Sequence, residues 1–127
     1  MFDWVISDAQ FWGIVLACLM MCADVLTGFI VAVINNEVSS TAMRKGLLHK
    51  VLTLVLIGAC LAIEIALTHM VVLPYDIPTC EVVCGYVVVM ELASVLENIG
   101  KGYPDFADSA VFKLFYLSDK DNKEQEQ

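Results

Sequence analysis

Two long apolar runs constrain the fold of this chain more than any other feature. Residues 11–34 contain one charged side chain, Asp24, and residues 51–73 contain one, Glu64. Each run is long enough to cross about 30 Å of hydrocarbon, which takes about 20 helical residues. Runs that are apolar on every side of the helix are typical of membrane spans rather than of amphipathic helices in soluble proteins. The sequence therefore predicts transmembrane helices at 11–34 and 51–73.

A third and more polar run follows at 82–100 and is broken by Gly100, Gly102 and Pro104. Hydrophobic residues make up 59% of the chain and charged residues 17%, against about 45–50% and about 25% in soluble domains. A small soluble protein of this composition would expose large apolar patches. We therefore expect an all-α integral membrane protein with three transmembrane helices.

The remaining segments are polar or interrupted by proline. Pro74 and Pro78 predict a turn, because proline does not continue a helix. The apolar residues between Phe106 and Tyr116 predict a short amphipathic helix at the membrane surface. The expected segments are an N-terminal segment outside the cytoplasm at 1–10, a cytoplasmic loop at 35–50, an outer loop at 74–81, the interfacial amphipathic helix at 104–117 and a disordered charged tail at 118–127.

The basic residues predict the orientation of the chain. All seven fall in the first loop or after the third run, and none lies in residues 1–10 or 74–81. Because cytoplasmic loops are enriched in Lys and Arg, we expect the N-terminus outside and the C-terminus inside. The absence of Lys or Arg before the first run also argues against a signal peptide. The residues expected to determine the topology are Arg44, Lys45, Lys50 and Lys101.

Several function classes do not fit the sequence. A net charge of −8 argues against nucleic-acid binding, which needs a basic face. His49 and His69 lie near opposite ends of one apolar run, so they are not paired haem ligands. We find no nucleophile–base set, phosphate loop or metal-ligand pattern, and so expect no enzyme, no cofactor and no metal. An odd number of cysteines in apolar runs indicates packing rather than disulfides: Cys18, Cys22, Cys60, Cys80 and Cys84.

Each apolar run carries a carboxylate near its middle, and we expect Glu64 and Glu91 to share one depth. A charge at a helix centre costs about 2.5–3.5 kcal/mol, whereas each Leu, Ile, Val or Phe returns about 0.3–0.6 kcal/mol. The third run is therefore marginal alone and needs protein partners, water or protonated carboxyls. Ionisable residues inside membranes usually serve function. The residues predicted to line a polar interior are Asp24, Glu64, Glu91, Ser94, Glu97 and Asn98.

Small residues recur along the first two runs at helical spacing. Such residues let membrane helices approach closely. A structural alternative stays open for these residues and for the acids, namely that they only hold three helices together. The residues expected to pack helices are Gly13, Ala17, Thr27, Gly28, Gly58, Ala62 and Ala66.

Four motifs follow one another along the chain: Asp24-x-x-Thr27-Gly28, Arg44-Lys45-Gly46 with Lys50, Glu91-x-x-Ser94-x-x-Glu97-Asn98 and Gly102-x-Pro104. Taken in order, these motifs resemble the toxin-secretion/phage-lysis holin family. The resemblance covers most of residues 20–105. It implies a homo-oligomer that opens lesions in the bacterial cytoplasmic membrane and releases an endolysin or an exported protein.

The C-terminal tail departs from the family pattern, in which a basic tail is common. Residues 119–127 contain more acidic than basic side chains, which puts regulation by anionic lipid in doubt.

Two alternative functions remain open. An antiholin or other membrane regulator of the same shape would not kill when expressed alone. A small channel, or a membrane anchor for a soluble enzyme, would instead belong to a larger assembly, and an anchor would present its cytoplasmic loop to the partner.

Overall fold

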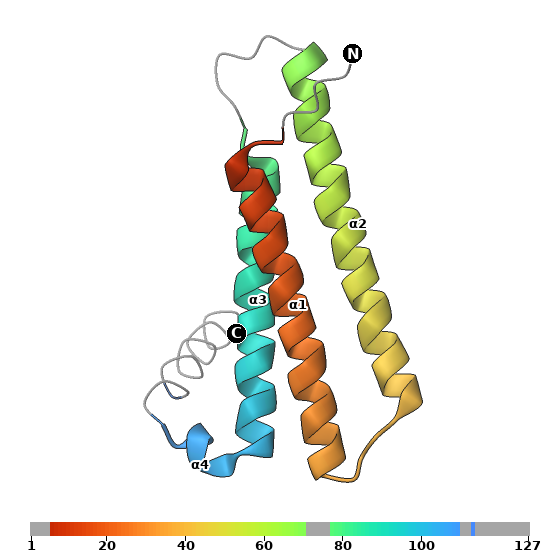
Figure 1. Ribbon diagram of the computed structural model, residues 1–127, viewed down its shortest axis with the longest axis vertical. Helices are drawn as coiled ribbons and strands as arrows, with labels where there is room; N and C mark the ends of the chain where they lie inside the picture. The colour runs from red at the N-terminus through yellow and green to blue at the C-terminus, as the bar shows by residue number, and fades with distance from the viewer. Residues whose placement is uncertain (1–5, 71–76, 110–112, 114–127) are drawn as a thin grey trace, which may run out of the picture.

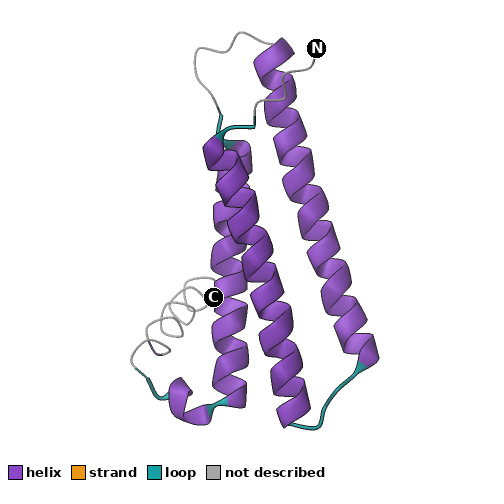
Figure 2. Ribbon diagram, in the orientation of Figure 1, coloured by secondary structure: helices purple, strands orange, loops and turns teal. Residues whose placement is uncertain are grey.

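The computed structural model describes residues 6–70, 77–109 and 113, and the described part is helical apart from short connections (Figure 2). The helices are α1 (Asp8–Ile34), α2 (Ser40–Met70), α3 (Thr79–Gly102) and the short α4 (Pro104–Ala107). The first three are long and apolar enough to cross a membrane. The predicted all-α fold with three candidate membrane helices is therefore confirmed.

Helix α1 begins before the apolar run because Ser7 and Gln10 form a capping box. The Gln10 backbone N–H donates to Ser7 Oγ over 3.2 Å, and the Ser7 N–H donates to Gln10 Oε1 over 2.9 Å. This exchange satisfies two backbone donors that the first turn would otherwise leave free. The helix therefore starts at Asp8, so the end of the expected N-terminal segment 1–10 is helical.

Helix α2 begins earlier than the apolar run at 51–73, and the connection from α1 is short. Residues 40–50 are helical, so only 35–39 join the two helices, and the expected loop at 35–50 is too long. The Ala42 N–H donates to Ser39 Oγ at the helix start. Alanine, leucine, lysine and arginine favour helix, so the polar segment extends α2. Residues 71–73 of the expected span and Pro74 lie outside the described residues.

Helices α1 and α3 run in the same direction and lie side by side, whereas α2 runs antiparallel and leans away (Figure 1). Small residues mark the α1–α3 interface from end to end. A Cβ built on Gly13 would lie 3.4 Å from Cys84 Cβ, and one on Gly28 would lie 3.4 Å from Asn98 Nδ2. A Cβ on Gly102 would lie only 2.8 Å from Val31 Cγ2. Glycine thus allows a close approach of these two helices.

The buried core is small and rich in small and sulfur-containing side chains. Large apolar side chains on all three long helices stay exposed, as a lipid-facing surface requires. Gly58, Ala62 and Ala66 are also exposed, so this face of α2 does not pack against α1 or α3. The buried apolar residues are Ala17, Met21, Ile57, Cys60, Cys80, Cys84 and Val87.

The chain turns after α3, where Pro104 starts α4. Proline suits the first position of a helix because its missing N–H would have no partner there. Of the expected interfacial helix at 104–117, α4 covers only Pro104–Ala107, and residues 110–112 and 114–117 lie outside the described residues. The tail at 118–127 lies outside them as well.

Candidate intramembrane polar site

Lys50 connects all three long helices through its ammonium group. Its Nζ lies 2.8 Å from Asp24 Oδ2 on α1 and also donates to Glu91 Oε2 on α3. The side chains of Lys50, Asp24 and Glu91 are only 16%, 18% and 10% exposed. A charge this far from water is costly unless an opposite charge pairs with it. We call these three residues the ion triad.

Asn98 extends the ion triad along α3 toward α1. Its Nδ2 donates to Asp24 Oδ1 over 3.0 Å and lies within hydrogen-bond distance of Thr27 Oγ1 at 3.3 Å. Thr27 in turn donates its hydroxyl hydrogen to backbone carbonyls of its own helix, at 2.9 Å for Ala23. Asp24 therefore accepts from an ammonium on one oxygen and from an amide on the other.

Glu64 makes a second polar contact between the helices, far from the ion triad. Its Oε1 accepts from Gln10 Nε2, and its Oε2 accepts from the backbone N–H of Cys80, both over 2.9 Å. Cys80 lies in the first turn of α3, where backbone N–H groups have no partner within the helix. Glu64 thus joins α2 to the beginnings of α1 and α3.

The expectation that Glu64 and Glu91 share one depth is wrong. Glu64 contacts the backbone of Cys80, and Glu91 lies about 16 Å further along α3 at about 1.5 Å per residue. The reason is that α2 and α3 are offset along the bundle, so equal distances from their ends do not correspond to equal depth. Glu64 and Glu91 therefore belong to two separate contacts.

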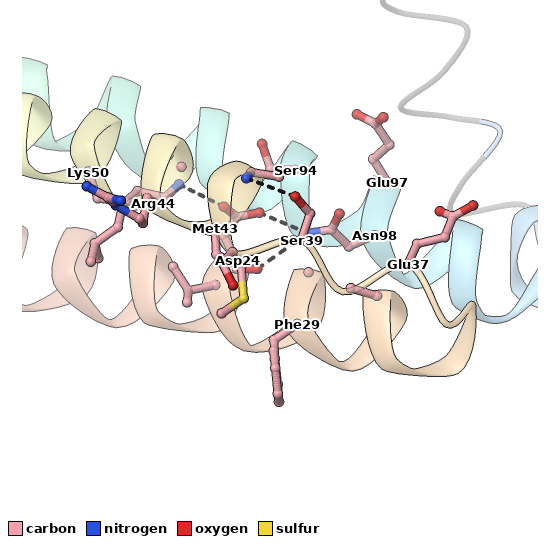
Figure 3. Close-up of a pocket in the computed structure, with 17 residues that line it drawn as sticks. Asp24, Phe29, Glu37, Ser39, Met43, Arg44, Lys50, Ser94, Glu97 and Asn98 are labelled. Atoms are coloured by element: carbon pink, nitrogen blue, oxygen red, sulfur yellow. Dashed lines mark hydrogen bonds and ion pairs between the residues drawn. The ribbon is translucent and has the colours of Figure 1, made fainter.

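Four of the residues predicted to line a polar interior form a polar stripe along α3, namely Glu91, Ser94, Glu97 and Asn98. This stripe is divided between two environments. Glu91 and Asn98 point into the bundle, whereas Glu97 is exposed and pairs with Lys101 Nζ at 2.6 Å along the same helix. Figure 3 shows Glu97 pointing away from the contact between Asp24 and Asn98. The pattern along α3 identified the polar residues but not which of them face a neighbouring helix.

A cavity of about 670 Å³ opens beside the ion triad between α1, the start of α2 and α3 (Figure 3). Its volume exceeds that of several water molecules, each of which occupies about 30 Å³ in the liquid. Apolar side chains such as Phe29 and Leu47 form part of its wall. The polar side chains at its wall include Asp24, Arg44, Lys50, Ser94, Glu97 and Asn98.

The cysteines differ in their part in the helix packing. All five are free: Cys60, Cys80 and Cys84 are buried, Cys18 is partly buried and Cys22 is exposed. Cys84 lies against Gly13 of α1. Within residues 6–70, 77–109 and 113, no group of three or more His, Cys, Asp or Glu side chains is arranged to hold a metal ion. The polar site is therefore built from ion pairs and hydrogen bonds.

The sequence did not identify Lys50 and Gln10 as partners of Asp24, Glu64 and Glu91. Lys50 was assigned to a cytoplasmic loop as a topology determinant, since it precedes the apolar run. The sequence does contain a pattern that relates Lys50 to Glu64. Lys50, Ile57 and Glu64 are seven residues apart and therefore share one helix face. Ile57 is buried on that face, which places Lys50 toward the bundle once α2 is extended.

Three helices that are long and apolar enough to cross a membrane, joined by partly buried ion pairs, define the class as a candidate multi-pass membrane protein with a charged site between its helices. The sequence model of the bacteriophage holin family matches residues 1–104, which include all three long helices and the whole polar site. The chain belongs to this family. No curated protein and no solved structure gives a significant match.

Family membership confirms the resemblance found in the motifs and gives the chain the role of a phage holin. The family is non-enzymatic, as the sequence predicted. Together with the three candidate membrane helices, it implies residence in the cytoplasmic membrane.

Proposed function

We propose that copies of this chain assemble in the bacterial cytoplasmic membrane and open lesions that release an endolysin or another protein cargo, which leads to lysis. The observation that carries this proposal is the match of the holin family to all three membrane helices. The exposed apolar surface of those helices leaves them free to contact lipid or further copies of the chain. Its partners are thus membrane lipid, other copies of itself and, functionally, the released protein.

The polar residues inside the helices are the proposed lining of the lesion. In the closed bundle Lys50 pairs with both Asp24 and Glu91, and Asn98 donates to Asp24. In an open assembly the same groups, together with Glu64, Ser94 and Glu97, would meet water, which solvates charge better than the bundle does. Solvation of these charged groups, whose burial costs the most free energy, therefore favours the open assembly. A switch between two states needs such a difference in free energy.

Expression of the full chain alone in a bacterial host tests this function. We expect loss of membrane potential and viability without any phage partner, followed by release of a co-expressed endolysin. Intact membrane potential at a normal level of inserted protein would contradict the proposal and favour an antiholin. Recovery of a stable complex with a soluble enzyme, without killing, would favour a membrane anchor.

Substitutions test the lining. Glu91→Leu and Glu97→Leu should insert more readily, because each removes a carboxylate from the membrane, and should delay or abolish killing. Val89→Leu on the exposed face of α3 is the matched control and should kill on the wild-type schedule. If both leucine variants of the glutamates also kill on that schedule at normal levels, the polar stripe is structural.

A further inference from the structure

Helix α2 is attached to the rest of the bundle at two polar points. Among the described residues, α2 contributes only Ile57 and Cys60 to the buried core, and both lie between Lys50 and Glu64. Its other large apolar side chains are mostly exposed, for example Leu52 and Val55. Figure 1 shows α2 leaning away from the closely packed pair α1 and α3.

Apolar packing holds such a helix weakly in a bilayer. Lipid tails are as apolar as leucine, so an exposed helix face gains little by leaving lipid for protein. An ion pair removed from water behaves differently, because its two charges cannot separate within hydrocarbon without a large cost. The position of α2 therefore depends chiefly on the ion triad and on Glu64.

We propose that Lys50 is the latch of the closed bundle: its ammonium holds α2 against Asp24 of α1 and Glu91 of α3, and its release frees α2 and opens the intramembrane acids to water. This inference rests on the proposed function for its consequence, lesion formation, but not for the closed arrangement itself. Lys50 acts here as a positioning residue. Asp24, Glu91 and Asn98 are the groups that it keeps covered.

The surroundings of Lys50 allow the latch to open. The adjacent cavity is lined by Asp24, Lys50, Ser94 and Asn98, so water entering it reaches both members of the pair between Lys50 and Asp24. Lys50 also stands at the start of the apolar run of α2. A long lysine side chain in this place can extend its ammonium to the membrane surface once its partners are solvated. The ammonium and the carboxylates then interact with water in place of each other.

Removal of the charge at position 50 tests the latch directly. Lys50→Met keeps the length of the side chain but leaves two neighbouring carboxylates without a cation, so α2 should separate. The readout is the modification rate of Ser94→Cys by a water-soluble maleimide, in membranes containing the full chain with its five native cysteines replaced by alanine. An open state normally populated at up to about 10% can become dominant, so we expect a rise of about tenfold or more.

A charge exchange makes the test specific to the ion triad. Lys50→Glu alone places three acids together and should also raise the labelling rate. Lys50→Glu combined with Glu91→Lys restores two acids and one cation at the same place and should return labelling and killing time to wild-type values. Lys45→Gln is the matched control, because Lys45 is an exposed lysine of the same helix, and it should label as wild type.

The outcomes separate the latch from the proposed function. Wild-type labelling in Lys50→Met, or no recovery in the exchanged pair, overturns the latch even if the protein kills cells. Suppose that labelling rises in Lys50→Met and Lys50→Glu and returns to wild type in the exchanged pair, but that the chain never permeabilises membranes. This result supports the latch and refutes the proposed function. If Lys50→Met does not accumulate, the exchanged pair decides: a wild-type rate supports the latch, and a tenfold higher rate contradicts it.

Discussion

Asn98 shows how one amide joins two membrane helices. It donates to Asp24 and lies beside Thr27, both on α1, at the place where Gly28 brings the two helices together. Hydrogen bonds between membrane helices contribute about 0.6 kcal/mol on average and up to about 1.7 kcal/mol. Because Asn98 bonds to a carboxylate, its contribution should lie toward the upper end of that range.

We therefore expect Asn98→Leu to lower the unfolding free energy of the chain in detergent by about 1–2 kcal/mol. Leucine is similar in size, so the change removes the donor rather than the volume. Thermal unfolding followed by circular dichroism measures the effect. Ser94→Ala, at the cavity wall, is the control and should shift the midpoint little. Equal midpoints for Asn98→Leu and the parent would show that the amide contributes no net stability.

The sequence predicts which residues are polar inside the membrane, but not their partners. Asp24, Glu91 and Asn98 stand out because each interrupts an apolar run. The side chains that satisfy them depend on how far one helix is shifted along another, and a single sequence carries little information on that shift. Lys50 was missed for this reason, since its partners lie on two other helices.

At the scale of helices, hydropathy predicts the three spans, because apolar runs of about twenty residues leave few alternatives. The ends of the helices follow other rules. The capping box of Ser7 and Gln10 starts α1 three residues before Phe11 of the apolar run, and helix-forming polar residues extend α2 back to Ser40. Both corrections concern polar residues, and hydropathy does not predict whether polar residues next to an apolar run are helical.

Glu64 provides a prediction for the attachment of α2 at the end opposite the ion triad. Glu64→Leu removes both acceptors, leaving Gln10 and the N–H of Cys80 without this partner, and should destabilise the bundle by about 1–3 kcal/mol. Glu64→Gln keeps one acceptor and should have a smaller effect. Thermal unfolding in detergent measures both variants. The reverse order of stability would mean that the two hydrogen bonds are not formed in the folded protein.

The exposed small-residue face of α2 provides a prediction for assembly. A Cβ built on Gly58 would meet nothing within 4 Å, and Gly58 is exposed, so Gly58→Leu should leave the fold of one copy unchanged. If Gly58, Ala62 and Ala66 pack against another copy, leucine at position 58 would prevent close approach and should weaken self-association severalfold. Cross-linking yield in membranes measures this effect.

Gly85→Leu is the matched control for that experiment. Gly85 is also exposed with nothing within 4 Å of a built Cβ, but it lies on α3 outside the small-residue face of α2. Its leucine variant should cross-link as the parent does. An equal loss in both variants would indicate a general effect of bulk on the lipid-facing surface, and no loss in Gly58→Leu would exclude this face from the interface.

At the scale of the whole molecule, the distribution of charge links the closed bundle to its orientation. Lys50 is engaged by two acids, so its charge is compensated within the bundle. The bias of basic residues toward one side then rests on Arg44 and Lys45 near the start of α2, on Lys101 at the end of α3 and on the three lysines that follow Lys101 in the chain. Arg44, Lys45 and Lys101 lie at the same end of the bundle, because α1 and α3 run in the same direction and α2, which lies between them in the chain, runs antiparallel (Figure 1).

We therefore predict that this end faces the cytoplasm, with the N-terminus outside and the C-terminus inside. Cytoplasmic retention of Lys and Arg beside membrane helices supplies the physical reason. A tag placed after Gln127 should resist protease in intact spheroplasts and become accessible after lysis, while a tag before Met1 should behave in the opposite way. Replacing Arg44, Lys45 and Lys101 with glutamine should yield a mixed population, whereas Lys50→Gln should leave the orientation unchanged because its charge is paired. Protease access to the C-terminal tag of the wild-type chain in intact spheroplasts would reverse the assignment.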